Sequence, residues 1–266
     1  MKYKLLITDM DGTLLNSQLK ISKKISDLIN MLKQKGMYFT IATGRSLIAI
    51  NNACDSNILW PNAPIASFNG AKITDHKDDT VLYEKFLERQ TAAEVLAFCK
   101  KLGAAAVVWS EGKLYFSEKN ERTMLYCKKT GLEAILLRDD NDFPNQTISK
   151  IICQDDPEKI EHYIEQLQGK LKGNVTFCTS ATDYLEFFNG DASKGAAAQF
   201  IAERLNILPS EIIAIGDQRN DIPMLKFAGL GVAMGNALDE VKAIADYVTL
   251  SNDEDGMAHV IEKFIL

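Results

Sequence analysis

Histidine and cysteine, the residues that build zinc sites and disulfide frameworks, are scarce and scattered in this sequence. It has three histidines and five cysteines among 266 residues, and no two cysteines form a CxxC pair. Zinc sites draw their ligands from short, regular spacings, so a His/Cys zinc site is disfavoured. We expect the cysteines to be reduced and mostly buried, as is typical of a cytoplasmic protein.

Long apolar runs and basic clusters are also missing. No stretch approaches the roughly 18 apolar residues that a membrane-spanning helix needs. The apolar stretch near the start is broken by Asp9, which is not the pattern of a signal peptide. The net charge is −6 and no block of lysine and arginine stands out, which argues against nucleic acid or a membrane as a partner.

The two ends of the chain alternate between strand and helix patterns. Apolar runs bounded by turn residues predict strands at 4–8, 38–42, 64–68, 212–215, 231–233 and 247–249. Apolar residues at helical spacing predict helices at 22–35, 46–54, 193–205, 222–227, 238–245 and 254–264. The β-α-β-α-β order predicts an α/β fold with a Rossmann-like, doubly wound parallel sheet as its core.

The middle of the chain departs from this alternation. Its helical spacings predict helices at 91–101, 121–129 and 157–167. Its apolar runs predict strands at 105–109, 114–117, 149–153, 175–179 and 184–188. This mixed pattern predicts a second, α+β domain at 84–187, inserted into a core made of residues 1–83 and 188–266.

Polar residues follow the predicted strands of the core. Because ligands bind beyond the carboxyl ends of the strands in such a sheet, we expect these residues to lie together. The first strand is followed by Asp9 and Asp11, and the strand at 212–215 by Asp217, Asn220 and Asp221. The remaining segments are Thr43-Gly44-Arg45 after the second strand, Asn69-Gly70 after the third, and Ser193-Lys194 at a helix start.

These residue types suit the transfer of a phosphoryl group to a carboxylate. Two neighbouring aspartates repel each other unless a cation neutralises them, and Asp9, Asp11 and Asp217 offer the oxygen ligands that Mg²⁺ prefers. A carboxylate nucleophile then forms an aspartyl-phosphate, which divides one difficult step into two. The remaining phosphate oxygens need donors, and the candidates are Thr43, Gly44, Lys194 and Asn220.

Each segment taken alone also has a purely structural interpretation. The DxDGT segment suits a turn after a strand, and Ser46 suits a helix N-cap in TGRS. Lys194 suits a solvated surface, and Asp217 suits a turn cap. Asn69-Gly70 is best interpreted as a hairpin turn. The coincidence of four such segments at one predicted sheet edge favours the phosphoryl-transfer interpretation over the structural ones.

The chain resembles the haloacid dehalogenase superfamily of phosphatases through four segments in the family's order: DMDGTLL, IATGR, SKG and GDQRNDIPML. The segment GVAMGNALDEVKAIADYVT is similar to the family's C-terminal motif. The likeness extends over the whole chain and is greatest to the Cof-type branch, type IIB, which carries a C2B cap.

This resemblance implies a role for each motif residue. Asp9 would be the nucleophile and a Mg²⁺ ligand. Asp11 would be the general acid and then the base, with its backbone carbonyl on Mg²⁺. Asp217 would be the acidic metal ligand, supported by Asp221 and Arg45. The phosphate would be bound by Met10 through its backbone N–H, and by Thr43, Gly44, Lys194 and Asn220.

We therefore expect a Mg²⁺-dependent phosphatase of small phosphorylated metabolites, with sugar phosphates as candidates. A phosphomutase or phosphotransferase on the same scaffold is one alternative. A non-catalytic phosphate-binding module is another, against which Asp11 argues because it would hasten hydrolysis. Arg219 stands shortly after Asp217, where many relatives have a small or acidic residue, and its effect on the charge near the metal is left open. Candidate substrate contacts in the cap are Trp109, Glu111, Tyr115 and Tyr184.

Overall fold

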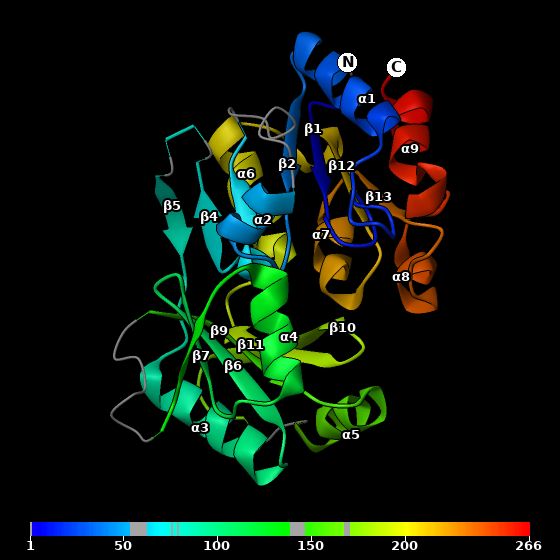
Figure 1. Cartoon of the computed structure of the whole chain (residues 1–266). Helices are drawn as coiled ribbons and strands as arrows, with labels where there is room; N and C mark the ends of the chain where they lie inside the picture. The colour runs from blue at the N-terminus through cyan, green and yellow to red at the C-terminus, as the bar shows by residue number, and fades with distance from the viewer. Residues whose placement is uncertain (1, 54–62, 76, 79, 139–146, 168–170) are drawn as a thin grey trace. The chain divides into compact units, whose positions relative to one another are not determined.

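The computed structural model describes residues 2–53, 63–75, 77–78, 80–138, 147–167 and 171–266, and it contains two compact units (Figure 1). The core unit comprises Met1–Glu84 and Ser193–Leu266, and the inserted unit comprises Lys85–Ala192. The limits predicted from the sequence, 84 and 187, lie one and five residues before those of the inserted unit. Each unit has its own cluster of buried apolar side chains.

A five-stranded sheet lies at the centre of the core unit. Its strand order is β14-β13-β12-β1-β2, and every neighbouring pair is parallel. All four residues of β1 and all five of β12 are buried, as is usual for strands covered on both faces. The strands are β1 (Leu5–Thr8), β2 (Tyr38–Ile41), β12 (Ile212–Gly216), β13 (Leu230–Ala233) and β14 (Tyr247–Val248).

The connections of this sheet run in two directions. From β1 the chain passes through α1 to β2, and from β12 it passes through α7 to β13, on the other side of β1. Because such crossovers are right-handed, the two connections place their helices on opposite faces. The point where the direction changes lies between β1 and β12, which is where doubly wound sheets bind ligands.

Helices cover the parallel sheet, and α1 packs with α9 while α6 packs with α7 (Figure 1). The helices of the core unit are α1 (Lys23–Gln34), α2 (Leu47–Ala53), α6 (Lys194–Leu205), α7 (Ile222–Phe227), α8 (Asp239–Ile244) and α9 (Gly256–Phe264). The predicted α/β class and these helices are confirmed. Cys54, the predicted last residue of the second helix, lies outside the described residues.

The third predicted strand differs from expectation. β3 (Ile65–Ser67) touches the parallel sheet through a single bridge, between Ala42 and Ala66. Its ladder partner is instead β4 (Lys72–Thr74), which pairs antiparallel with both β3 and β5 (Val81–Glu84). The chain turns back at Phe68–Gly70, so pairing with the adjacent segment closes only a short loop. The hairpin turn predicted at Asn69-Gly70 is confirmed.

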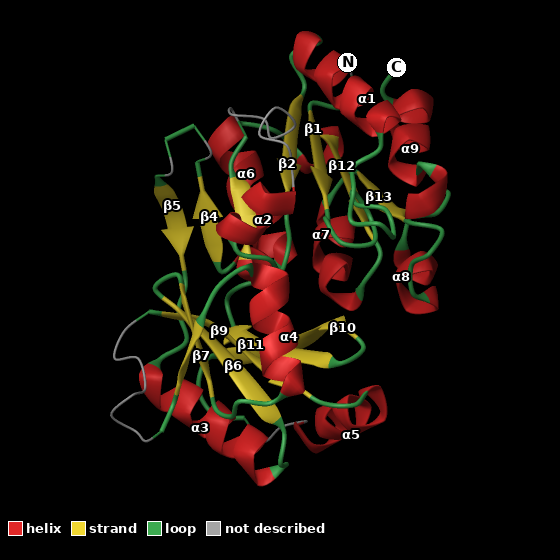
Figure 2. Cartoon of the chain, in the orientation of Figure 1, coloured by secondary structure: helices red, strands yellow, loops and turns green. Residues whose placement is uncertain are grey.

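In its described residues, the inserted unit forms a six-stranded sheet with three helices (Figure 2). Its strand order is β10-β11-β9-β6-β7-β8, and side chains of α3 and α5 share one apolar cluster with one face of the sheet. The elements are α3 (Arg89–Lys101), β6 (Ala105–Ser110), β7 (Lys113–Phe116), α4 (Glu121–Thr130), β8 (Ala134–Leu136), β9 (Ile148–Gln154), α5 (Pro157–Leu167), β10 (Val175–Ala181) and β11 (Tyr184–Asn189).

Two composition-based expectations can be compared with the described residues. Of the described cysteines, Cys99, Cys127 and Cys153 are free thiols; Cys99 and Cys153 are buried, and Cys127 and Cys178 are half-buried. Among the described helices, none has the length and apolar character needed to cross a bilayer.

Candidate active site

The segment after β1 contains Asp9 and Asp11, which lie two positions apart but in different surroundings. The Asp9 amide donates to the carbonyl of Ile215 at 2.9 Å, which extends the β1–β12 pairing by one residue. The side chain of Asp9 is buried, and the following Met10 side chain is fully buried in the apolar core. The Asp11 side chain is 46% exposed. Asp9 and Asp11 therefore occupy different environments.

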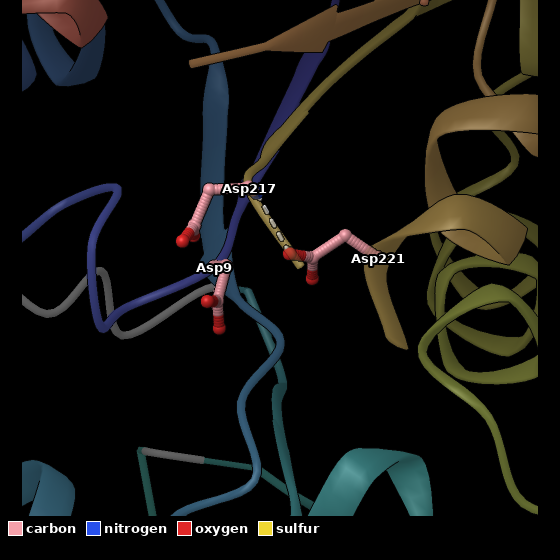
Figure 3. A group of neighbouring side chains, drawn as sticks. All are labelled: Asp9, Asp217 and Asp221. Carbon is pink, nitrogen blue, oxygen red and sulfur yellow. Dashed lines mark hydrogen bonds between the residues drawn. The ribbon is translucent and has the colours of Figure 1, made fainter. Parts of the chain in front are cut away.

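Asp9, Asp217 and Asp221 form a compact acidic cluster (Figure 3). Each offers a carboxylate oxygen, and these oxygens all lie within 4.8 Å of one another. Asp9 follows β1, Asp217 follows β12, and Asp221 ends the short 3₁₀ turn Arg219–Asp221. All three are buried, so the switch point of the sheet carries a dense negative charge.

Hydrogen bonds hold these carboxylates in place. Asp221 Oδ2 accepts from the backbone N–H groups of Asp217 and Gln218, both at 2.9 Å. The Thr13 hydroxyl donates to Asp217 Oδ1 at 2.8 Å. Gly12 has φ +74°, and a Cβ at that position would lie 2.6 Å from Asp217 Oδ2. Glycine is therefore required there by both the backbone conformation and the close approach.

Lys194 joins two members of the cluster. Its ammonium donates to Asp9 Oδ1 and to Asp221 Oδ1, both at 2.6 Å, and its side chain is 0% exposed. It lies in the first turn of α6, whose N-cap Ser193 accepts from the Ala196 N–H at 3.0 Å. A cation is disfavoured at a helix N-terminus, and here the two carboxylates supply the compensating charge.

The electrostatics of the cluster favour an added cation. Burial raises the pKa of Asp9 well above its usual range, with Lys194 opposing and the neighbouring carboxylates adding to the rise. Burial and Asp221 raise the pKa of Asp217 to about 6. Within the described part of the chain, one ammonium contacts two of these three carboxylates, which leaves two negative charges on the group when all are ionised. A divalent cation with oxygen ligands fits this charge and donor set.

Asp11 is held by Arg45 outside the acidic cluster. The Arg45 guanidinium donates to both Asp11 oxygens, at 2.7 Å from Nε and 2.5 Å from a terminal nitrogen. Such a two-point contact fixes the orientation of the carboxylate as well as its place. The described carboxylates that could share a metal therefore include that of Asp221 but not that of Asp11. If Asp11 contributes a metal ligand, that ligand is its backbone carbonyl, as the resemblance predicts.

The segment after β2 leaves the sheet at the same edge. Thr8 of β1 is in register with Ile41 of β2, so residues 9–13 and 43–45 emerge side by side. Thr43 is buried, and its hydroxyl accepts from the Arg45 N–H at 3.2 Å. The amide of Asn220 donates through Nδ2 to Asn69 Oδ1 at 2.9 Å. Its own Oδ1 is buried without a partner among the described residues.

Comparison with known proteins decides the family. A family model described as haloacid dehalogenase-like hydrolase matches residues 6–261. The chain belongs to this family. The Cof-type resemblance predicted from the motifs is thereby confirmed.

Several curated relatives of this hydrolase are named phosphatases. The chain is 31% identical to the 5-amino-6-(5-phospho-D-ribitylamino)uracil phosphatase YcsE of Bacillus subtilis, covering 99% of this chain and 96% of that protein. It is 28% identical to Phosphatase YwpJ of Bacillus subtilis, covering 98% and 100%. A haloacid dehalogenase-like hydrolase from Bacteroides thetaiotaomicron superposes with a TM-score of 0.86 at 28% identity, covering 99% and 100%. The chain is thus an enzyme of the phosphatase class.

Thr13 and Gln218 of the hydrolase's site escaped the sequence analysis, and Asn69 was expected at this sheet edge only as part of a hairpin turn. Thr13 and Gln218 both hydrogen-bond the Asp217 carboxylate, and Asn69 holds Asn220. The position of Asn69 after the third strand pointed to the site, but interpreting it as a hairpin turn did not predict its hydrogen bond to Asn220. Arg219, two residues after Asp217, pairs with Glu240 on α8, and both side chains are at least 44% exposed.

The candidate substrate-contacting residues of the inserted unit differ in how far they are buried. Trp109 is 1% exposed and donates through Nε1 to the Tyr126 hydroxyl at 2.8 Å, so it belongs to the packed interior of that unit. Tyr115 is half-buried. Glu111 is exposed in the β6–β7 turn, and Tyr184 is half-buried beside Lys129. Contact of these residues with a substrate stays a prediction.

Proposed function

We propose that this hydrolase is a Mg²⁺-dependent phosphatase of small phosphorylated metabolites that works through an aspartyl-phosphate. The observation that carries the proposal is the buried cluster of Asp9, Asp217 and Asp221, which contacts a single ammonium, that of Lys194, in the described chain. Such a cluster leaves a charge of −2, which suits a divalent cation. A phosphate ester brings further negative charge, so its approach to this edge depends on that cation.

The metal would be held by Asp9, Asp217 and the backbone carbonyl of Asp11. When bound, Mg²⁺ supplies positive charge that lets an anionic nucleophile meet an anionic ester. Asp221 already accepts hydrogen bonds from Lys194 and from two backbone amides, so it supports the site by fixing these groups. Asp9 and Asp217 are the carboxylates left to face the ion.

Asp9 acts as the nucleophile. One carboxylate oxygen of Asp9 forms a bond to phosphorus while the bond from phosphorus to the ester oxygen breaks. Lys194 donates to Asp9 Oδ1 and so fixes the rotation of the carboxylate. Backbone amides of Met10 and Gly44, with the Thr43 hydroxyl and the Asn220 amide, bind the phosphate oxygens. Their charge grows in the transition state, which is where fixed donors lower the barrier.

Asp11 carries the proton. In the first step it protonates the departing ester oxygen, and in the second it takes a proton from the water that attacks the aspartyl-phosphate. Its position outside the acidic cluster, held by Arg45, supports a role separate from that of Asp9.

The substrate class is proposed from the relatives. YcsE is named for a phosphorylated ribityl compound, and this likeness supports phosphorylated sugars or polyols as substrates of the present chain. The choice among such metabolites is assigned to the inserted unit, because every proposed metal and phosphate residue lies in the core unit.

Turnover of p-nitrophenyl phosphate with and without Mg²⁺ tests the proposal. We expect phosphate release that requires Mg²⁺ and that stops on adding EDTA. Release of phosphate without an added sugar acceptor would distinguish hydrolysis from phosphoryl transfer to a sugar. A panel of phosphorylated sugars and polyols, ranked by kcat/KM, then identifies the substrate. Equal turnover in EDTA would contradict the metal requirement, and no turnover of any phosphate ester would contradict the proposal itself.

A further inference from the structure

The short turn Phe68–Gly70 between β3 and β4 has an unusual backbone. Its three residues, Phe68, Asn69 and Gly70, have φ values of 51°, 56° and 91°. The left-handed region disfavours residues with a side chain, and a strained stretch persists only where its surroundings fix it. Phe68 and Asn69 are also buried, at 6% and 1% exposure. This combination calls for a reason beyond joining two strands.

The backbone of the turn is tied to the segment after β2. The Asn69 N–H donates to the carbonyl of Thr43 at 2.9 Å, and the Phe68 N–H donates to the carbonyl of Arg45 at 3.0 Å. Residues 43–45 carry the proposed phosphate ligands Thr43 and Gly44. The turn therefore fixes the path of a phosphate-binding segment through two hydrogen bonds.

The same turn packs against the start of α6. A Cβ added at Gly70 would lie 2.3 Å from the carbonyl oxygen of Ser193, so only glycine allows this approach. Ser193 is the N-cap of α6 and immediately precedes Lys194. The turn thus contacts the element that carries the buried ammonium.

The side chain of Asn69 reaches the third phosphate-binding element. Its Oδ1 accepts from Asn220 Nδ2 at 2.9 Å, across a sequence separation of 151 residues. The Nδ2 of an asparagine carries two hydrogens. The bond to Asn69 uses one and fixes the plane of the amide, which leaves the other for a phosphate oxygen.

We propose that Asn69 is a positioning residue of the phosphate site, acting through Asn220. The inference rests on the proposed function, because Asn220 must bind phosphate for its orientation to matter. Asn69 touches no reacting atom in this account. It holds the amide of Asn220 in the orientation that binds phosphate, and its strained backbone conformation is maintained for that contact.

The test compares Asn69→Gly with Asn206→Gly. Glycine suits the left-handed backbone, so Asn69→Gly removes the side chain without adding strain. Asn206 is the matched control, because it has nearly the same conformation (φ 54°, ψ 46°) but is exposed at the end of α6. Both variants should melt within a few degrees of the wild-type protein.

We expect Asn69→Gly to raise two constants by about 3- to 10-fold, the usual worth of one hydrogen bond. These are the KM for p-nitrophenyl phosphate and the inhibition constant of inorganic phosphate. The Mg²⁺ concentration for half-maximal activity should stay the same, and Asn206→Gly should change none of these values. If Asn69→Gly leaves both constants within twofold of the wild type, or if Asn206→Gly shifts them equally, the inference is overturned.

A double-mutant cycle tests the route through Asn220. If Asn69 acts through that amide, the double variant Asn69→Gly/Asn220→Ala should be no worse than Asn220→Ala alone. Additive losses would overturn the inference. Calorimetric titration with inorganic phosphate separates it from the proposed function. A wild-type protein that binds phosphate without turnover would sink the proposed function, while phosphate affinities of the variants would still decide the role of Asn69.

Discussion

Asp9 and Asp11 show how two identical residues, two positions apart, acquire different properties. Asp9 continues the line of β1, is buried and contacts Lys194. Asp11 lies after the buried Met10, is 46% exposed and pairs with Arg45. Different surroundings allow two identical carboxylates to take the separate roles proposed for them, Asp9 as nucleophile and Asp11 as acid and base.

Asp9→Asn should abolish turnover while the protein stays folded, because an amide is not a nucleophile in this reaction. Thermal unfolding should show a melting temperature close to that of the wild type, since Lys194 keeps its contact with Asp221. Asp27→Asn is the matched control, as Asp27 is an exposed helix residue paired with Lys23. Substantial activity in the folded Asp9→Asn protein would contradict the mechanism.

Asp11→Asn should lower kcat by about 10²–10⁴, the usual worth of general acid–base catalysis. Rapid-mixing experiments with a chromogenic ester should detect a burst if the second step becomes the slower one. Because Asp11 lies outside the acidic cluster, the Mg²⁺ dependence should change little. An unchanged kcat would remove Asp11 from proton transfer.

At the scale of elements, the site depends on which segments leave the sheet together. β1 and β12 are neighbours, so Asp9 and Asp217 emerge at one edge, and the first turn of α6 places Lys194 against Asp9. No single helix or strand supplies all the residues of this site. The arrangement concentrates carboxylates where burial raises the pKa of Asp9 and Asp217.

The raised pKa values predict how pH and Mg²⁺ act on stability. A buried carboxyl with a raised pKa stabilises the metal-free fold when protonated, below about pH 4, and this contribution is lost as pH rises through about 6 for Asp217. Mg²⁺ binds the ionised form. The Mg²⁺-induced rise in melting temperature should therefore be small at pH 5 and largest above about pH 7.

Thermal unfolding from pH 5 to 8, with and without Mg²⁺, measures this effect. Asp217→Asn should remove most of the Mg²⁺-induced rise at neutral pH, and Asp27→Asn, on the exposed face of α1, should retain it. The same rise at pH 5 and pH 7.5 in the wild type would show that these carboxyls do not govern metal binding.

At the scale of the whole molecule, chemistry and selection are assigned to different units. The proposed metal and phosphate residues all lie in the core unit, and the inserted unit has a separate apolar cluster of its own. Contacts away from the phosphate supply binding energy that discriminates between substrates. Substitutions in the inserted unit should therefore change substrate choice without changing the metal requirement.

Glu111→Gln and Tyr184→Phe test this division. Both keep the shape of exposed or half-buried side chains in the inserted unit. We expect a changed kcat/KM ranking across a panel of phosphorylated metabolites, with p-nitrophenyl phosphate turnover and Mg²⁺ dependence retained. Tyr247→Phe is the matched control, since the Tyr247 hydroxyl contacts His259 within the core unit. If neither variant altered the ranking, these two residues would not contribute to selection.

Local patterns in the sequence were enough to predict the elements that are long, apolar or bounded by turn residues. The runs at 4–8 and 212–215 predicted β1 and β12 because buried parallel strands are apolar along their whole length. The predicted helices at 157–167 and 222–227 coincide with α5 and α7. The motif spacing also predicted the family, because chemistry at strand ends needs particular residue types in a fixed order.

Only the tertiary structure decided which distant side chains meet. Lys194 contacts Asp9 across 185 residues and Asn220 contacts Asn69 across 151, and neither contact follows from any local pattern. The departure of β3 from the parallel sheet depended on pairing with β4, a three-residue strand that local propensity did not reveal. Short strands and buried polar contacts are fixed by packing against elements remote in sequence, so their energy belongs to the whole fold.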